Sequence, residues 1–232
     1  TTSGWDFKVK ELLREMGFFD LLNVDKHQHV VVDKKTVFLR IVSADLEKER
    51  NGGLLAVELR EQIKKFTQHI DELKLYEALS EALMNVIHHA CSGGADYKTK
   101  LFWMSASYEL DTGKLSVVFY DQGRGISRTV KSMGYYERFR DKLPADFMKL
   151  SDANKLKALV MKPRSQSDIQ GRGNGIPKMI ELARGDRGNS FTIISRNGCC
   201  ITRLEDGHVA ESSAVSLPSS LRGTLISWKL YL

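Results

Sequence analysis

LFWMSASYEL-DTGK-LSVVFY-DQGRG, residues 101–125, is the stretch that decides the fold. Residues 101–110 and 115–120 are rich in β-branched and aromatic side chains, which favour strands, and the four residues DTGK between them are typical of a hairpin turn. Asp121 comes directly after the second strand and is followed by Gly123 and Gly125. The stretch therefore predicts an antiparallel hairpin whose second strand ends in a carboxylate and a glycine-containing turn.

Asp121 is the first candidate ligand-binding residue. A carboxylate at the end of a strand can accept the exocyclic amino hydrogen of adenine, which distinguishes adenine from guanine. Gly123 and Gly125 allow the backbone to turn tightly and a flat base to approach closely. The alternative is an ordinary turn that ends the strand, and the pattern alone leaves both open.

A second patch lies upstream, in the helical run of residues 71–90. Glu81 and Asn85 are four residues apart, so they project from one face of the helix, where they interrupt an apolar stripe. An asparagine amide oxygen can complete the octahedral shell that magnesium forms with phosphates and water. A carboxylate one turn away can orient or deprotonate a nucleophile. A surface glutamate beside a helix-bonded asparagine is the alternative.

The third patch, Gly171-Arg-Gly-Asn-Gly175, precedes a predicted helix. Free backbone N–H groups at such a junction bind phosphate, which makes the patch a candidate phosphate cradle. It lacks the GxxxxGK[ST] pattern of a P-loop, and no strand directly precedes it, as a dinucleotide-binding fingerprint requires. A glycine hinge of a mobile loop remains the alternative.

The remaining elements follow from apolar periodicity and turn residues. We expect one α+β sandwich: a mixed, mostly antiparallel sheet with helices covering one face. Residues 1–70 are expected to form a helical and β-hairpin extension packed on the core of residues 71–232. The other expected elements are helices over residues 5–16, 46–70 (interrupted at 51–53) and 176–183, hairpins over residues 29–42 and 191–204, and a final strand over residues 224–230 after a serine-rich loop. The turn of the second hairpin is Arg196-Asn-Gly198.

Composition describes an ordinary globular chain, with 42% hydrophobic and 28% charged residues. No apolar run approaches the roughly 20 residues that span a bilayer, so we expect no membrane association. The three cysteines form no CxxC pair, which favours a reducing cytoplasm. The net charge of +6 comes with a basic cluster over residues 128–187, which we interpret as a solvated lid; a nucleic-acid surface is possible but not favoured.

Taken in their order along the chain, the three patches resemble the sequence boxes of the GHKL superfamily, the ATP-binding domain of gyrase B, heat-shock-90 chaperones, histidine kinases and mismatch-repair ATPases. The resemblance covers roughly residues 70–232. Residues 81–90 are similar to the N box, residues 121–126 to the G1 box, residues 171–176 to the G2 box, and Gly223-Thr224 to the threonine motif.

The resemblance implies a Bergerat-type fold that binds ATP and Mg²⁺. It places Asn85 on magnesium, Asp121 on adenine, and Thr224 in support of the adenine pocket. The glycines of the third patch would anchor a long lid, residues 127–170, over the phosphates. The full set of expected nucleotide-binding residues is Asn85, His89, Asp121, Gly123, Gly125, Ile126, Gly171, Arg172, Gly173, Asn174, Gly175 and Thr224.

Glu81 and His89 indicate the branch of the superfamily. An acid four residues before the asparagine is found in ATP-hydrolysing members and in anti-sigma serine kinases, and His89 resembles the histidine-kinase and anti-sigma pattern. We expect a regulatory domain in which Glu81 is catalytic and ATP is hydrolysed under the lid to switch contact with a protein partner or a second copy. A serine/threonine kinase of anti-sigma type and a non-catalytic ATP-gated module remain alternatives.

Overall fold

Five strands form one antiparallel sheet in a computed structural model that describes residues 6–22, 35–45, 52–87, 101–132, 143–161, 175–185, 188–205 and 208–232. The spatial order is β1-β2-β3-β5-β4. All four pairings are antiparallel, so the described strands include no parallel pair where we expected a mixed sheet. The strands are β1 (Thr36–Asp45), β2 (Leu101–Glu109), β3 (Lys114–Asp121), β4 (Ser190–Glu205) and β5 (His208–Tyr231).

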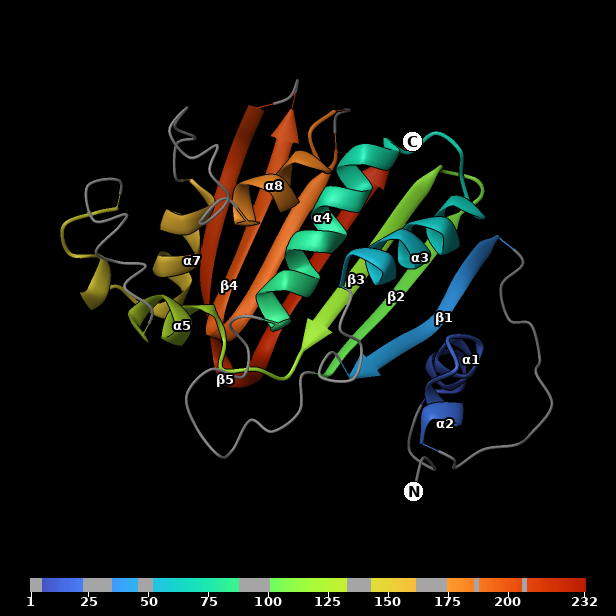
Figure 1. Cartoon of the computed structure of the whole chain (residues 1–232), viewed down its shortest axis with the longest axis horizontal. Coiled ribbons are helices and arrows are strands. Elements are labelled where there is room, and N and C mark those ends of the chain that lie inside the picture. The colour runs from blue at the N-terminus through green and yellow to red at the C-terminus, as the bar shows by residue number, and fades with distance from the viewer. Residues whose placement is uncertain are drawn as a thin grey trace.

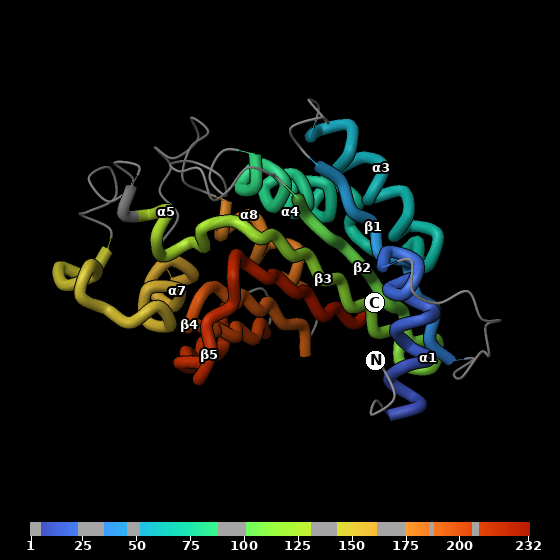
Figure 2. Tube along the Cα trace, turned by 90° about the horizontal axis from the view of Figure 1, so that it is seen from below, coloured from blue at the N-terminus to red at the C-terminus, as the bar shows by residue number. Residues whose placement is uncertain are grey.

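Helices α3, α4 and α8 lie over one face of the sheet (Figure 1), and all three are on the same side of the strands in Figure 2. This confirms the α+β class. None of the helices in the described ranges is long and apolar enough to cross a membrane. The helices are α1 (Phe7–Glu15), α2 (Phe18–Leu21), α3 (Gly52–Lys64), α4 (Glu72–Asn85), α5 (Ile126–Ser132), the 3-10 helix η3 (Phe147–Lys149), α7 (Asp152–Val160) and α8 (Gly175–Glu181).

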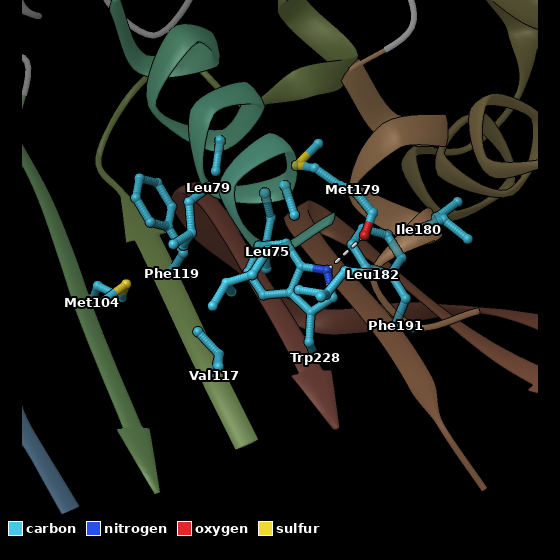
Figure 3. Packing of buried hydrophobic residues seen from close by; sticks show 14 of the residues in the cluster. Leu75, Leu79, Met104, Val117, Phe119, Met179, Ile180, Leu182, Phe191 and Trp228 are labelled. Carbon is cyan, nitrogen blue, oxygen red and sulfur yellow. Dashed lines mark hydrogen bonds between the residues drawn. The ribbon is translucent and has the colours of Figure 1, made fainter. Parts of the chain in front are cut away.

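The core lies between this face and the helices. Trp228 of β5 is fully buried, and its indole Nε1 donates to the carbonyl of Met179 at 2.7 Å, which fixes the end of α8 on the sheet (Figure 3). Phe102 and Phe119 stack with their centroids 5.1 Å apart on neighbouring strands. Buried residues of α3 belong to the same cluster as those of α4.

The N-terminal segments share this sheet. Residues 36–45 pair with β2. The expected hairpin partner of this strand, residues 29–32, lies outside the described residues, so that hairpin stays a prediction. Helix α1 lies beside the β1 edge in both views, where the N–H of Ile41 donates to the carbonyl of Met16 at 2.8 Å. The domain boundary at residue 70 stays a prediction.

Two expectations for the C-terminal part are wrong. Residues 190–205 form one strand instead of a hairpin, and this strand pairs with β5 on both sides of Asn197. The serine-rich segment expected to be a loop belongs to β5, which runs from His208 to Tyr231. The residues expected to form the turn, Arg196-Asn-Gly198, instead shift the β4–β5 register.

Candidate functional site

Helix α4 positions Glu81 and Asn85. Asp71 caps its N-terminus, since Oδ1 accepts from the N–H groups of Leu73 at 3.1 Å and Lys74 at 3.0 Å. One stripe of the helix is buried, consisting of Leu75, Ala78, Leu79, Ala82 and Leu83. This stripe seats α4 on the sheet and leaves Glu81 and Asn85 half-buried on its flank.

Gly175, the first residue of α8, lies against both of these side chains. A Cβ built on Gly175 would be 3.2 Å from Glu81 Oε2 and 3.7 Å from both terminal atoms of the Asn85 amide. The Asn85 side chain has no hydrogen-bond partner among the described residues. The patch of Glu81 and Asn85 and the last residue of the third patch, Gly175, therefore meet in space.

Lys178 joins this group one turn along α8. Its Nζ donates to Glu81 Oε1 at 2.8 Å, with 41% of the lysine side chain and 26% of the glutamate side chain exposed. The other carboxylate oxygen, Oε2, is the one that faces Gly175. Glu81 thus pairs with Lys178 through one oxygen and faces Gly175 with the other.

The alternation of buried and partly exposed side chains along β3 determines where Asp121 lies. Leu115, Val117, Phe119 and Asp121 are the buried residues of the strand, so the carboxylate lies on the helix-covered face. Thr224 of β5 is its direct cross-strand partner and is also buried. The pairing thus brings the G1-like box and the threonine motif together at the end of the sheet.

The Asp121 carboxylate is stabilised by neutral donors. Oδ1 accepts from the N–H of Gly123 at 2.7 Å, and Thr224 supplies hydrogen bonds from its backbone and its hydroxyl. Burial in an apolar surrounding outweighs these hydrogen bonds and raises the pKa of Asp121 from 3.8 to about 6. Such an acid is ionised at neutral pH at a cost in stability, which is common where a carboxylate has a task.

The turn after Asp121 packs against β4 and β5. Gly125 has a φ of +81°, and a Cβ there would be 2.8 Å from Ser195 Oγ. Ser195, fully buried, accepts from the N–H of Ile126 at 2.9 Å and donates to the carbonyl of Gly223 at 3.2 Å. Its hydroxyl therefore ties the start of α5 to β5.

The two halves of the site lie at one end of the fold. Figure 1 shows the C-terminal ends of α4 and β3 at the same end of the sheet, where β3 terminates. Ile126 and Ile176, which follow Gly125 and Gly175, pack against the same small cluster of Val130, Leu143, Phe147 and Leu159. This cluster comes from described parts of the expected lid, so α5, η3 and α7 form a packed layer beside the site.

The structure thus groups two sets of predicted residues. Glu81, Asn85 and Gly175 meet at the α4–α8 contact; Asp121, Gly123, Gly125, Ile126 and Thr224 meet at the end of β3. His89, Gly171, Arg172, Gly173 and Asn174 lie outside the described residues.

Sequence reasoning missed Ser195 and Lys178. The signal for Ser195 was the alternation Phe191, Ile193, Ser195 on β4, which predicts a hydroxyl on the buried face. The signal for Lys178 was its position three residues after Gly175, on the same side of a helix. No protein-family model matches the chain, and no curated protein shows significant similarity to it.

Proposed function

We propose that this chain is a magnesium-dependent ATP-binding regulatory domain with the Bergerat-type fold of the GHKL superfamily. The observation that supports this most strongly is buried Asp121 opposite Thr224 at the end of β3, at the edge toward which α4 carries Glu81 and Asn85. A buried carboxylate stabilised only by neutral donors is costly, and base recognition would give it a task.

Asp121 would recognise the base. A carboxylate offers about four lone-pair positions, and the hydrogen bonds from Gly123 and Thr224 leave capacity for one more donor. The exocyclic amino group of adenine is such a donor, whereas guanine presents a carbonyl oxygen at the corresponding position. The site therefore favours adenine nucleotides.

Asn85 and Gly175 would lie beside the phosphates. The amide oxygen of Asn85 suits a magnesium ligand, and the missing side chain of Gly175 leaves room against Glu81 and Asn85. Magnesium, when bound, would neutralise phosphate charge. Gly171, Arg172, Gly173 and Asn174 join this part of the site only through the resemblance.

Glu81 would supply the base for turnover. Its Oε2 is free of Lys178, so it can accept the proton of a water that attacks the terminal phosphorus as the bond to the ADP oxygen breaks. The partial exposure of Glu81 also admits a serine or threonine hydroxyl of a partner, which would make the domain a protein kinase of anti-sigma type. Without turnover, ATP would only order the lid and gate a partner interaction.

Calorimetric titration with a non-hydrolysable ATP analogue and magnesium tests the proposal, on wild type and Asp121→Asn side by side. We expect wild type to bind and the variant to lose about 100-fold in affinity, because the amide is uncharged and no longer a pure acceptor. The GTP analogue should bind weakly to both. Equal binding by the two proteins, or binding by neither, would contradict the adenine site.

Phosphate release and transfer then rank the modes of action. An ATPase releases phosphate from wild type and not from Glu81→Gln, which should still bind the analogue. A kinase transfers the terminal phosphate to a partner protein. A gating module binds ATP equally in both proteins and shows neither activity.

A further inference from the structure

The ion pair between Lys178 of α8 and Glu81 of α4 points to a role for Lys178 in nucleotide binding, which rests on the proposed function. Lys178 is the only cation that pairs with Glu81 among the described residues, at 2.8 Å. A carboxylate beside a polyphosphate is electrostatically unfavourable, because like charges a few ångströms apart repel each other. The lysine makes the pair neutral as a whole and so removes most of that repulsion.

The geometry points to Lys178 as a positioning residue that compensates the charge of Glu81 and thereby sets the preference of the site for a nucleoside triphosphate over a diphosphate. Glu81 would act at the terminal phosphate, so its charge opposes that phosphate most. Lys178 acts on the same group, since it binds Oε1 while Oε2 faces Gly175. The effect should therefore be large for ATP and small for ADP.

The chain contains a matched control pair on the same helix. Lys64 of α3 lies 2.8 Å from Glu72, in the first turn of α4, so it also joins a second helix to α4 through a lysine and a glutamate. The two pairs have the same length and comparable exposure, but Lys64 and Glu72 lie at the opposite end of α4 from Asn85. Substitution of Lys64 therefore measures the effect of losing an interhelical ion pair away from the site, and any additional effect of substituting Lys178 arises at the site.

The test is calorimetric affinity for the magnesium complexes of a non-hydrolysable ATP analogue and of ADP. Lys178→Met should weaken the ATP analogue about tenfold and ADP less than threefold, while Lys64→Met changes neither. Lys178→Arg, which keeps the charge, should restore most of the affinity. Circular dichroism melting of each variant verifies that it is folded.

A double variant shows whether Lys178 acts through Glu81. In the Glu81→Gln background the charge to be compensated is absent, so Lys178→Met should cost less than threefold. An undiminished loss in that background would overturn the inference in favour of direct phosphate binding, and wild-type affinities in Lys178→Met would overturn it altogether. Failure of wild type to bind either nucleotide would instead refute the proposed function on which the inference rests.

Discussion

Two carboxylates at one end of the fold are held in opposite ways. Asp121 is 7% exposed and is stabilised by backbone N–H groups and a hydroxyl, whereas Glu81 is partly exposed and paired with a lysine. The β3–β5 end consists of tightly packed backbone; the α4–α8 contact consists of side-chain ends around a glycine. The rigid β3–β5 end suits a neutral, flat group that has to match its shape. The α4–α8 contact suits a charged group, because its own charged side chains can compensate that charge.

Substitution of Gly223 should have the largest effect on stability. A Cβ there would lie 1.9 Å from the carbonyl oxygen of Asp121, and the φ of +91° is unfavourable for other residues. We expect Gly223→Ala to lower the free energy of unfolding by about 3 kcal/mol or more, because backbone has to move. Urea denaturation measures this. Gly185→Ala, whose Cβ would find only one atom at 3.8 Å, is the control and should change little.

Asp121→Asn should stabilise the protein while removing the carboxylate proposed to bind adenine. The folded-state pKa of about 6 exceeds the ordinary 3.8, so the native state binds a proton more readily, and stability falls as pH rises through this window. Well above pH 6, ionised Asp121 lowers the free energy of unfolding by its full amount, which is at most about 3 kcal/mol for a pKa shift of this size. The variant should therefore be more stable than wild type by about 1 to 3 kcal/mol at pH 7.5.

The pH dependence provides the control for Asp121. Near pH 4 the native states of both proteins carry an uncharged side chain at residue 121, so most of the difference between their urea midpoints should disappear. A stability difference independent of pH would show that the carboxylate is not the cause.

Local patterns predicted the elements whose signals are local. The β2–β3 hairpin, helix α4 and helix α8 lie close to where turn residues and apolar periodicity placed them. The hairpin expected at Arg196-Asn-Gly198 is wrong because these residues serve a long-range contact. A Cβ on Gly198 would be 2.6 Å from the backbone of Asp152 and Ala153, so the glycine admits the start of α7. Arg196 reaches its positive φ of 55° within a strand, not in a reversal.

The candidate site shows the same division. Motif spacing identified Glu81, Asn85, Asp121 and Gly175, because each lies in a recognisable local pattern. Ser195 bonds to Ile126, 69 residues away in the sequence, and Lys178 bonds to Glu81, 97 residues away. No local sequence pattern indicates such distant partners.

Ser195→Ala should have an intermediate effect at the β3–β5 end. It removes the acceptor of the Ile126 N–H and the donor to Gly223, and leaves a part-buried N–H unpaired. We expect the free energy of unfolding to fall by about 1 to 2 kcal/mol in a urea titration. Ser227 is partly exposed on neighbouring β5, and Ser227→Ala should change stability by less than about 0.5 kcal/mol. Equal effects of the two substitutions would contradict a structural role for the Ser195 hydroxyl.

Gly175→Ala should change stability least and separates the two regions most clearly. Its Cβ would meet Glu81 Oε2 at 3.2 Å, but that atom is the end of a side chain that can move, and alanine favours a helix over glycine. The two effects oppose each other, so the free energy of unfolding should change by less than about 1 kcal/mol. The displaced carboxylate would still disturb Lys178 and Asn85, and affinity for the ATP analogue should fall. If Gly175→Ala instead unfolded the protein as readily as Gly223→Ala, the α4–α8 contact would be as rigid as the strand pairing. The Glu81 side chain would then have no freedom to adjust its position to a ligand.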